Sequence, residues 1–444
     1  MNAILYKKKK LTSSQVIILG FSGVVLLGTF TLMLPFSSRE SIVTPFLDAL
    51  FTSVSAVCVT GLVVHDTAAY WSSFGQLVIL FLIQIGGMGV ITVAASFAII
   101  SGRKLSLMQR STMQEAIAAP KVGGIVRLTS FIVRLTLFIE LLGAAVMAPI
   151  FIRDFGLKGL WMALFHSISA FCNAGFDLMG TKKAFSSLTG YAANPVINLT
   201  VILLIIVGGI GFLTWDDIRT NRQHLQKYRM QSKVIFCTTA VLLAVPAIYF
   251  FFYEFASLPL KERIFYSFFQ SVTPRTAGFN TADLTAFSEP GQAVIIALML
   301  IGGSPGSTAG GMKTTTVAVL FATALSTFCR KEDTHFFGRR IDHDVVKNAA
   351  TILLMYLVLF FFGGLAISIA EGLPMITCLF ETASAVGTVG LTLGITPSLG
   401  TFSRIILILL MFFGRVGGLT LIFAALSGSR KISAKLPQEK LTVG

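Results

Sequence analysis

The sequence predicts an all-α integral membrane protein, built from four tandem repeats in a pseudo-four-fold arrangement around one pore. Hydrophobic residues make up 54% of the 444 residues and charged residues only 12%, about half the charged fraction of a soluble domain. Eight apolar runs are long enough to be transmembrane helices. A short segment ending in glycine also occurs four times, and internal repeats of this kind indicate the architecture.

The eight apolar runs are the membrane spans of this prediction. The first follows Lys7–Lys10, as a signal peptide would, but it is longer than an ordinary signal sequence and lacks an A-x-A cleavage site. We therefore expect it to be retained. The runs cover residues 14–35, 74–100, 128–150, 192–214, 233–253, 292–322, 346–369 and 401–426.

The four glycine segments each separate two of these runs. In every copy a phenylalanine stands ten residues before the glycine, and Leu or Phe follows it, in Phe51–Leu62, Phe165–Phe176, Phe268–Phe279 and Phe380–Leu391. Each repeat is thus predicted to contain an outer helix, a short pore helix, a filter loop and an inner helix. The pore helices are expected to begin near Pro45, Lys158, Leu260 and Leu373.

A pore helix of about 12 residues rises roughly 18 Å, about half of the hydrocarbon thickness. It cannot span the membrane and must form a re-entrant loop, whose backbone carbonyls are tolerated only against protein or a water-filled path. Four such loops offer rings of carbonyls and four negative helix ends to a desolvated cation. One such glycine alone would more simply end a buried helix, whereas four in register favour a pore.

The inner runs carry a second set of glycines, at Gly86-Gly87, Gly208-Gly209, Gly302-Gly303 and Gly414. Only the third run is predicted to be broken, because residues 302–311 hold five glycines and a proline. We interpret this loop as a gate, with a kink tolerated by packing as the alternative. Arg415 lies within the last run and must find acceptors: it either holds the gate loop, opposes cations or reaches the interface. Lys313 and Glu140 are further candidates, Glu140 more simply as a partner of a neighbouring span.

The net charge of +15 is distributed unevenly. With the N-terminus in the cytoplasm, 23 of the 35 Lys and Arg residues fall on that side, when Lys233 and Lys347 at the ends of two loops are included, and 8 fall on the other. This is the asymmetry of the positive-inside rule. Both termini are therefore predicted to be cytoplasmic. The predicted cytoplasmic segments are 1–13, 101–127, 215–232, 324–345 and 427–444, and the predicted repeats are 14–100, 128–214, 233–323 and 346–426.

Several other functions are disfavoured. The basic residues are spread over separate loops without an aromatic stacking pattern, which argues against nucleic acid, and the five cysteines show no C-x-x-C spacing. Residues 302–306 match the G-x-S-x-G motif of serine hydrolases, but Ser304 would need a histidine at its depth, and all five histidines lie in predicted loops or at a pore-helix start. We expect no enzyme. Four repeats running in the same direction also favour a channel-like path over an alternating-access carrier.

With four filter loops, a broken third inner run and an arginine in the fourth, the chain resembles the Trk/Ktr/HKT superfamily of potassium and sodium uptake proteins over essentially its whole length. The stretches TPRTAGFN, IQIGGMG and FGRVGG are most similar to KtrB-type subunits of bacterial Ktr systems. The resemblance implies channel-like potassium permeation across a bacterial cell membrane, and glycine at position 61 favours potassium. A sodium-selective, or sodium- or proton-coupled, member is the alternative.

The resemblance also implies the site residues. The filter carbonyls that bind potassium would belong to Cys58, Val59, Thr60, Gly61, Cys172, Asn173, Ala174, Gly175, Arg275, Thr276, Ala277, Gly278, Gly387, Thr388, Val389 and Gly390. The gate would comprise Gly302, Gly303, Ser304, Pro305, Gly306, Ser307, Thr308, Ala309, Gly310, Gly311, Lys313 and Arg415. Asn173 and Arg275 break the four-fold identity of the filter, and the Arg275 side chain is expected to turn away from the ions.

The implied partners are membrane lipid, a second copy in a homodimer and a cytosolic ring of nucleotide-binding regulatory subunits that docks on the cytoplasmic loops and the tail. The chain has no phosphate-binding loop of its own, because the motif fails at Gly311-Met312-Lys313. The nucleotide is therefore expected on the partner. No cofactor is expected on this chain beyond the transported potassium, with sodium allowed as an activator.

Overall fold

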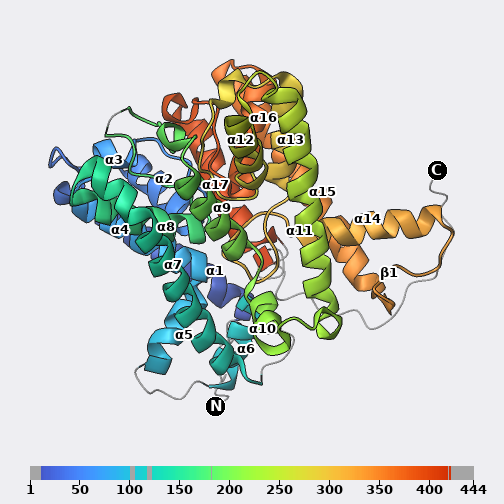
Figure 1. Ribbon diagram of the computed structural model, residues 1–444. Coiled ribbons are helices and arrows are strands. Elements are labelled where there is room, and N and C mark those ends of the chain that lie inside the picture. Colours follow the sequence, from blue (N-terminus) through green and yellow to red (C-terminus); the bar gives the residue numbers. More distant parts are fainter. Residues whose placement is uncertain (1–11, 101–105, 118–122, 182, 419, 422–444) are drawn as a thin grey trace, which may run out of the picture.

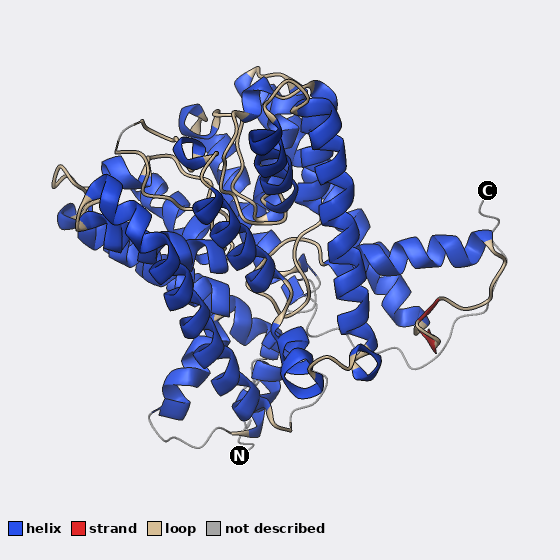
Figure 2. Ribbon diagram, in the orientation of Figure 1, coloured by secondary structure: helices blue, strands red, loops and turns tan. Residues whose placement is uncertain are grey.

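The computed structural model describes residues 12–100, 106–117, 123–181, 183–418 and 420–421. Within them the chain is predominantly helical, and loops gather at one end of the molecule and through its centre (Figure 2). The basic stretch Lys7–Lys10, part of the predicted cytoplasmic segment 101–127 and the predicted tail 427–444 lie outside the described residues. The repeat boundaries and the side on which the termini lie stay predictions.

Four long apolar helices correspond to the predicted outer helices. Among the described residues, four helices are long and apolar enough to cross a membrane, or up to six if each of two bent pairs counts as one span. The outer helices are α1 (Ser13–Leu32), α7 (Ile125–Phe155), α11 (Met230–Tyr249), which continues as the π-helix η4 (Phe250–Glu254), and α15 (His343–Glu371).

Each outer helix is followed by a short helix that packs against it. These are α2 (Phe46–Val57), α8 (Lys158–Phe171), α12 (Leu260–Val272) and α16 (Met375–Gly387). A proline precedes three of them, at positions 45, 259 and 374, where its missing N–H costs nothing. At 12 to 14 residues, all four are too short to span a membrane.

Three of the four inner segments begin at a side-chain cap. The four segments are α4 (Ser73–Met88), α9 (Pro195–Gly209), α13 (Glu289–Leu300) and α17 (Thr401–Val416). Ser72, Asn194 and Ser288 each accept a hydrogen bond from a first-turn N–H group of their helix, which is the preferred way to satisfy these donors.

The prediction that only the third inner run is broken was wrong. Runs 74–100 and 192–214 are bent by 97° and 94°, into α5 (Val90–Ile100) and α10 (Phe212–Asn221). α17 likewise ends before Gly417. The breaks fall at glycines with φ of +85°, +99° and +88°, at positions 89, 211 and 417, a backbone conformation that other residues resist. In the third run residues 301–313 are non-helical, and α14 (Thr314–Phe328) follows them.

The remaining elements connect the repeats. α6 (Leu107–Ile117) lies inside the predicted loop 101–127, and α14 projects away from the body of the molecule (Figure 1). A two-stranded antiparallel hairpin of β1 (His335–Phe336) and β2 (Arg339–Arg340) follows it. The other elements are α3 (Thr67–Tyr70) and the 3-10 turns η1 (Pro35–Ser37), η2 (Thr189–Tyr191), η3 (Leu225–Lys227), η5 (Leu284–Ala286) and η6 (Thr396–Ser398).

Candidate ion pathway

The four repeat glycines form a closed ring. A methyl group built on any of them would come within 3.0 Å of the carbonyl oxygen that precedes the glycine of the next repeat. The pairs are Gly61 with Ala174, Gly175 with Ala277, Gly278 with Val389, and Gly390 with Thr60. Because the last pair returns to the first repeat, the four loops surround one axis.

The four loops share one backbone conformation. The glycines have φ of +91°, +68°, +78° and +94°, and the residues two positions earlier, Val59, Asn173, Thr276 and Thr388, have φ of +57°, +58°, +71° and +52°. A stretch that alternates between left-handed and ordinary conformations turns successive carbonyls toward the same side. The predicted filter residues therefore have the backbone from which rings of carbonyls can be built.

A buried phenylalanine and a hydroxyl one turn later anchor each loop. The pairs are Phe51/Ser55, Phe165/Ser169, Phe269/Thr273 and Phe380/Ser384, and all four rings are fully buried. In the third repeat this anchor is Phe269, not Phe268, which is 36% exposed. Counting back ten residues from the glycine gives Phe268 here, because the third loop has one residue fewer between its hydroxyl residue, Thr273, and Gly278.

The hydroxyls of these pairs bind the loop backbone directly. Ser55 and Ser384 accept from the N–H groups of the filter glycines, Gly61 and Gly390, at 3.0 Å. Ser169 donates to the carbonyl of Phe176 at 2.7 Å, and Thr273 donates to that of Phe279 at 2.5 Å. The loops are therefore held by their own pore helices.

The second set of glycines lets the inner helices touch the ends of the pore helices. A methyl group on Gly86, Gly208 or Gly414 would clash with the carbonyl of Val57, Phe171 or Val386, the residue four positions before the filter glycine of the same repeat. The third repeat differs. Gly302 instead lies against Gly310 and Gly311 of its own loop.

The loop 301–313 is hydrogen-bonded to the inner segments of repeats two and four. Its Ser304 N–H donates to Gly209 O at 3.0 Å, and the Phe212 N–H donates to Gly306 O at 2.7 Å, both between repeats three and two. The Gly311 N–H donates to Gly414 O of repeat four at 3.2 Å. Gly306 also packs against the carbonyl of Ile117 in α6, so the predicted cytoplasmic segment supports the loop.

The same loop touches the filter from below. Asn173 donates from Nδ2 to Thr308 Oγ1 at 3.3 Å, and Thr308 donates in turn to Phe171 O at 3.0 Å. On the other side, Gly310 has no room for a methyl group beside Thr388 Oγ1. Repeats two and four are the two ring neighbours of repeat three, so residues 308–310 lie against the filter loops of both neighbours.

Two cationic side chains bind this loop through carbonyl oxygens. Arg415 donates to Thr308 O and to the carbonyls of Gly86 and Gly87, the last at 3.1 Å. Lys313 donates to Ala309 O at 2.8 Å and to Gly310 O at 3.2 Å. A cavity of about 270 Å³ opens beneath them, lined by Arg415, Lys313, Gly306, Gly311, Glu115 and their neighbours.

Glu140 lies beside the second filter loop. Its carboxylate accepts from Gln84 Nε2 at 3.2 Å, its other oxygen lies 3.8 Å from Cys172 Sγ, and its backbone carbonyl accepts from Ser167 at 2.6 Å. The residue is 2% exposed. It therefore joins α4, α7 and α8, as expected of a residue that pairs with a neighbouring span.

Arg275 is 7% exposed and its Nε atom has no hydrogen-bond partner in the described part of the chain. That its guanidinium turns away from the ions stays a prediction. Ser304, the residue of the hydrolase-like motif, bonds with Thr314 Oγ1 at 3.2 Å. Among the described residues no group of three or more His, Cys, Asp or Glu side chains could hold a metal ion.

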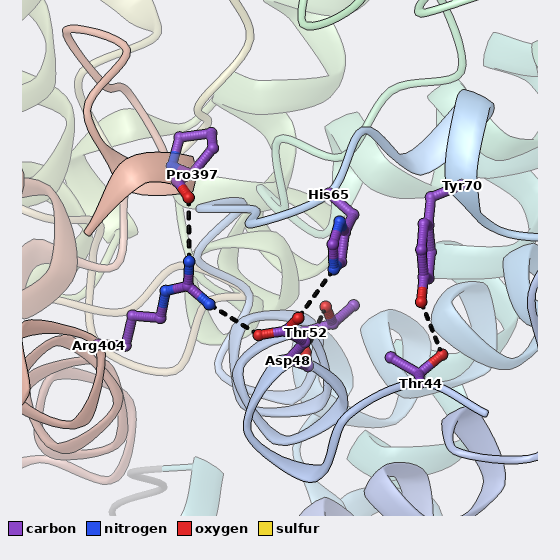
Figure 3. A network of polar contacts seen from close by, with 7 residues as sticks. All are labelled: Thr44, Asp48, Thr52, His65, Tyr70, Pro397 and Arg404. Carbon is purple, nitrogen blue, oxygen red and sulfur yellow. Dashed lines mark hydrogen bonds and ion pairs between the residues drawn. The ribbon is translucent and has the colours of Figure 1, made fainter. Parts of the chain in front are cut away.

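At the filter end of the molecule, a polar network joins the first and last repeats (Figure 3). Arg404 of α17 donates to Asp48 of α2 at 2.7 Å and to Pro397 O at 3.0 Å. The His65 ring lies 3.0 Å from the other Asp48 oxygen and stacks on Tyr70, with ring centroids 4.1 Å apart. Tyr70 in turn donates to Thr44 at 3.1 Å.

The ring of four glycine loops between apolar helices fits a membrane protein of the cation-transport class. The chain belongs to the TrkH family of cation transport proteins, whose family model matches residues 5–435. This is not a family of enzymes. The computed fold also matches the crystal structure of the potassium transporter TrkH from Vibrio parahaemolyticus, with a TM-score of 0.72 at 19% identity, over 95% of this chain and 86% of that one.

Two curated relatives are similar over nearly their full lengths. The chain is 39% identical to the potassium/sodium uptake protein NtpJ of Enterococcus hirae, over 98% of both chains. It is 37% identical to the Ktr system potassium uptake protein B of Bacillus subtilis, over 94% of this chain and 93% of that one.

Sequence reasoning missed three glycines of the pathway. Gly89, Gly211 and Gly417, where the inner segments break, each stand three residues after Gly86, Gly208 and Gly414. That spacing is readable in the sequence as a G-x-x-G pattern. It was overlooked because the apolar run continues past the break in each case.

Proposed function

We propose that this protein is the ion-translocating membrane subunit of a bacterial potassium uptake system, with channel-like permeation through the four glycine loops. The observation that carries the proposal is the closed ring of Gly61, Gly175, Gly278 and Gly390, in which each glycine lies against a carbonyl of the next repeat. The names of the two relatives support potassium as the ion. In this proposal the four repeats contribute eight membrane spans and four pore loops, with both termini in the cytoplasm.

The proposed gate is the loop 302–311. It lies against the second and fourth filter loops and accepts hydrogen bonds from Arg415 and Lys313 through its own carbonyls. The positive charges of Arg415 and Lys313 also repel a permeating cation at this point. In this proposal the loop blocks the axis and opening moves it aside. The inner segments of repeats two and four, which bond to the loop, are the means by which a signal can reach it.

That signal is proposed to come from a cytosolic ring of nucleotide-binding regulatory subunits, with this chain as a homodimer. The support is the resemblance to Ktr systems and the name of the Bacillus relative, which is a component of such a system. α6 and α10 carry the contact to the gate loop, at Ile117 and Phe212. They lie in or beside predicted cytoplasmic segments.

The test is rescue of a bacterium that lacks potassium uptake, at low external potassium, with and without a co-expressed regulatory subunit. The wild-type protein should restore growth, and Gly175→Ala should not, because a methyl group there meets the Ala277 carbonyl at a φ of +68°. Gly23→Ala is the matched control, since nothing lies within 4 Å of a methyl group at Gly23. Failure of the wild type at confirmed expression would sink the proposal.

Sodium is the second candidate ion, favoured by the name potassium/sodium uptake protein of the Enterococcus relative. Flux measured separately with potassium and with sodium distinguishes the two. A flux carried by sodium alone would replace potassium in the proposal while leaving the pathway unchanged.

A further inference from the structure

A basic pocket lies between the first turns of α7 and the helix α10, apart from the ion pathway. Its cavity of about 400 Å³ is lined by Gly124, Arg127, Phe131, Arg219, Arg229 and their neighbours. Three of these side chains are arginines. We call this site the α7–α10 pocket.

The charges of the pocket are only partly compensated. Arg229 is paired with Asp216 at 2.9 Å and with Asp217 at 3.3 Å. Arg127 and Arg219 form no ion pair within the described residues. The Arg219 guanidinium lies over the Phe131 ring, 4.7 Å from its centroid, which restricts its motion and leaves its edge donors available.

The start of α7 adds to this positive potential. Its N-cap is Gly124, which offers no side chain to accept from the first N–H groups. These donors and the positive end of a 31-residue helix therefore lie at the pocket.

The pocket lies at the depth of the lipid headgroups. Leu137, Leu141 and Ile152 of α7 are 49%, 62% and 40% exposed and mark its lipid-facing belt. Arg134 is exposed one turn before this belt, and its guanidinium must extend to the membrane interface to be hydrated. Arg127 lies two turns beyond Arg134. α10 is bent by 94° from the apolar helix α9.

We propose that the α7–α10 pocket binds the phosphate of an anionic phospholipid headgroup, with Arg127 and Arg219 as its ligands. Guanidinium groups bind phosphate oxygens through paired N–H donors, and basic pockets between helices at the membrane surface bind anionic headgroups. The acyl chains would lie along the exposed belt of α7. This site requires only that α7 spans the membrane, and it is independent of the ion and of the gate.

The experiment uses the purified full-length protein in a neutral detergent, with phosphatidylglycerol, phosphatidylcholine or inorganic phosphate added. Bound lipid is counted by native mass spectrometry and the thermal unfolding midpoint is followed in parallel. Phosphatidylglycerol should be retained and raise the midpoint, whereas the two other additions should not. Arg127→Gln and Arg219→Gln should each weaken phosphatidylglycerol binding about fivefold, the effect of one basic residue at a membrane surface.

Arg219→Lys keeps the positive charge and should keep most of the phosphatidylglycerol binding. Comparison with Arg219→Gln therefore distinguishes a folding defect from the loss of the charge that binds the phosphate. Arg339→Gln is the matched control, an exposed arginine of the hairpin. Wild-type binding in the double variant Arg127→Gln/Arg219→Gln would overturn the proposal. Equal stabilisation by inorganic phosphate would also overturn it, since the ligand would then be a free anion.

Discussion

At the scale of single residues, the pathway depends on the absence of side chains at a few positions. Gly61 has a φ of +91° and lies against the Ala174 carbonyl and Gly175 Cα. The φ value alone disfavours any other residue, and the contact excludes even a methyl group. The sequence identified Gly61 and its three counterparts from their register, because the same backbone requirement recurs in every repeat.

Gly61→Ser is expected to reduce the preference for potassium over sodium about tenfold, because the displaced Ala174 carbonyl loses an interaction of about 1–3 kcal/mol. The measurement is the ratio of potassium to sodium uptake in the same cells. Gly23→Ser, in a position without neighbours within 4 Å, is the control. An unchanged ratio at Gly61→Ser would contradict the filter assignment.

Arg415 is the second residue whose role is testable alone. Arg415→Gln removes charged donors from Thr308 O, Gly86 O and Gly87 O, and each such bond contributes about 1.5–3 kcal/mol. The proposed gate loop should then open more often, so that flux without the regulatory subunit rises at least about tenfold. The flux is measured in vesicles with this chain alone. Arg415→Lys keeps the positive charge and should give a flux between those of the wild type and Arg415→Gln. A folded Arg415→Gln protein with the flux of the wild type would show that Arg415 does not hold the loop.

At the scale of elements, the long outer helices and the short pore helices followed from the sequence, because hydropathy and length are local properties. The bends of 97° and 94° after α4 and α9 did not, because the hydropathy of each run continues unchanged past the G-x-x-G pattern that marks the bend. Each turn lies at a positive-φ glycine, Gly89 or Gly211, and Gly211 lies against Pro305 O of the gate loop. In the third repeat the phenylalanine ten residues before the glycine is Phe268, but the buried one is Phe269, because that loop has one residue fewer and a different side of the helix faces the core.

The contact between the gate loop and the fourth filter loop can be tested as a pair. Gly310→Ala should lower uptake, because its methyl group clashes with Thr388 Oγ1. Thr388→Ala removes that atom, so the double variant should recover part of the loss. The coupling between contacting sites is on the order of 1 kcal/mol.

The wild type, the two single variants and the double variant form a double-mutant cycle, and their initial rates of potassium uptake are compared. Gly190→Ala serves as the control, since nothing lies within 4 Å of a methyl group there. Strictly additive effects of the two substitutions would show that the loop and the filter are not coupled at this contact.

At the scale of the whole molecule, the ring must be closed between the first and the last repeat, which are farthest apart in the sequence. The contact of Gly390 with the Thr60 carbonyl closes it at the filter. The pair of Arg404 and Asp48 does it again at the surface (Figure 3), with side chains 18% and 14% exposed. Both contacts join repeat four to repeat one.

Asp48→Asn should lower the free energy of unfolding by about 1–3 kcal/mol, because it leaves the Arg404 charge partly buried without its partner. Thermal unfolding of the purified protein measures this. Arg340→Gln breaks the pair with Asp333, whose side chains are 73% and 38% exposed, and should change the stability by less than about 1 kcal/mol. Equal effects of the two substitutions would argue against a role of Asp48 in closing the ring.

Hydropathy and register, which are read along the chain, are enough to identify a helical membrane protein with four glycine segments at matching positions. What each of these glycines touches is found only in the folded chain. Arg415 reaches carbonyls 329 and 328 positions away, and residues 308–310 lie between Asn173 and Thr388 under the filter. Such contacts depend on how closely the backbones of different repeats approach, and the sequence of one repeat carries no record of that distance.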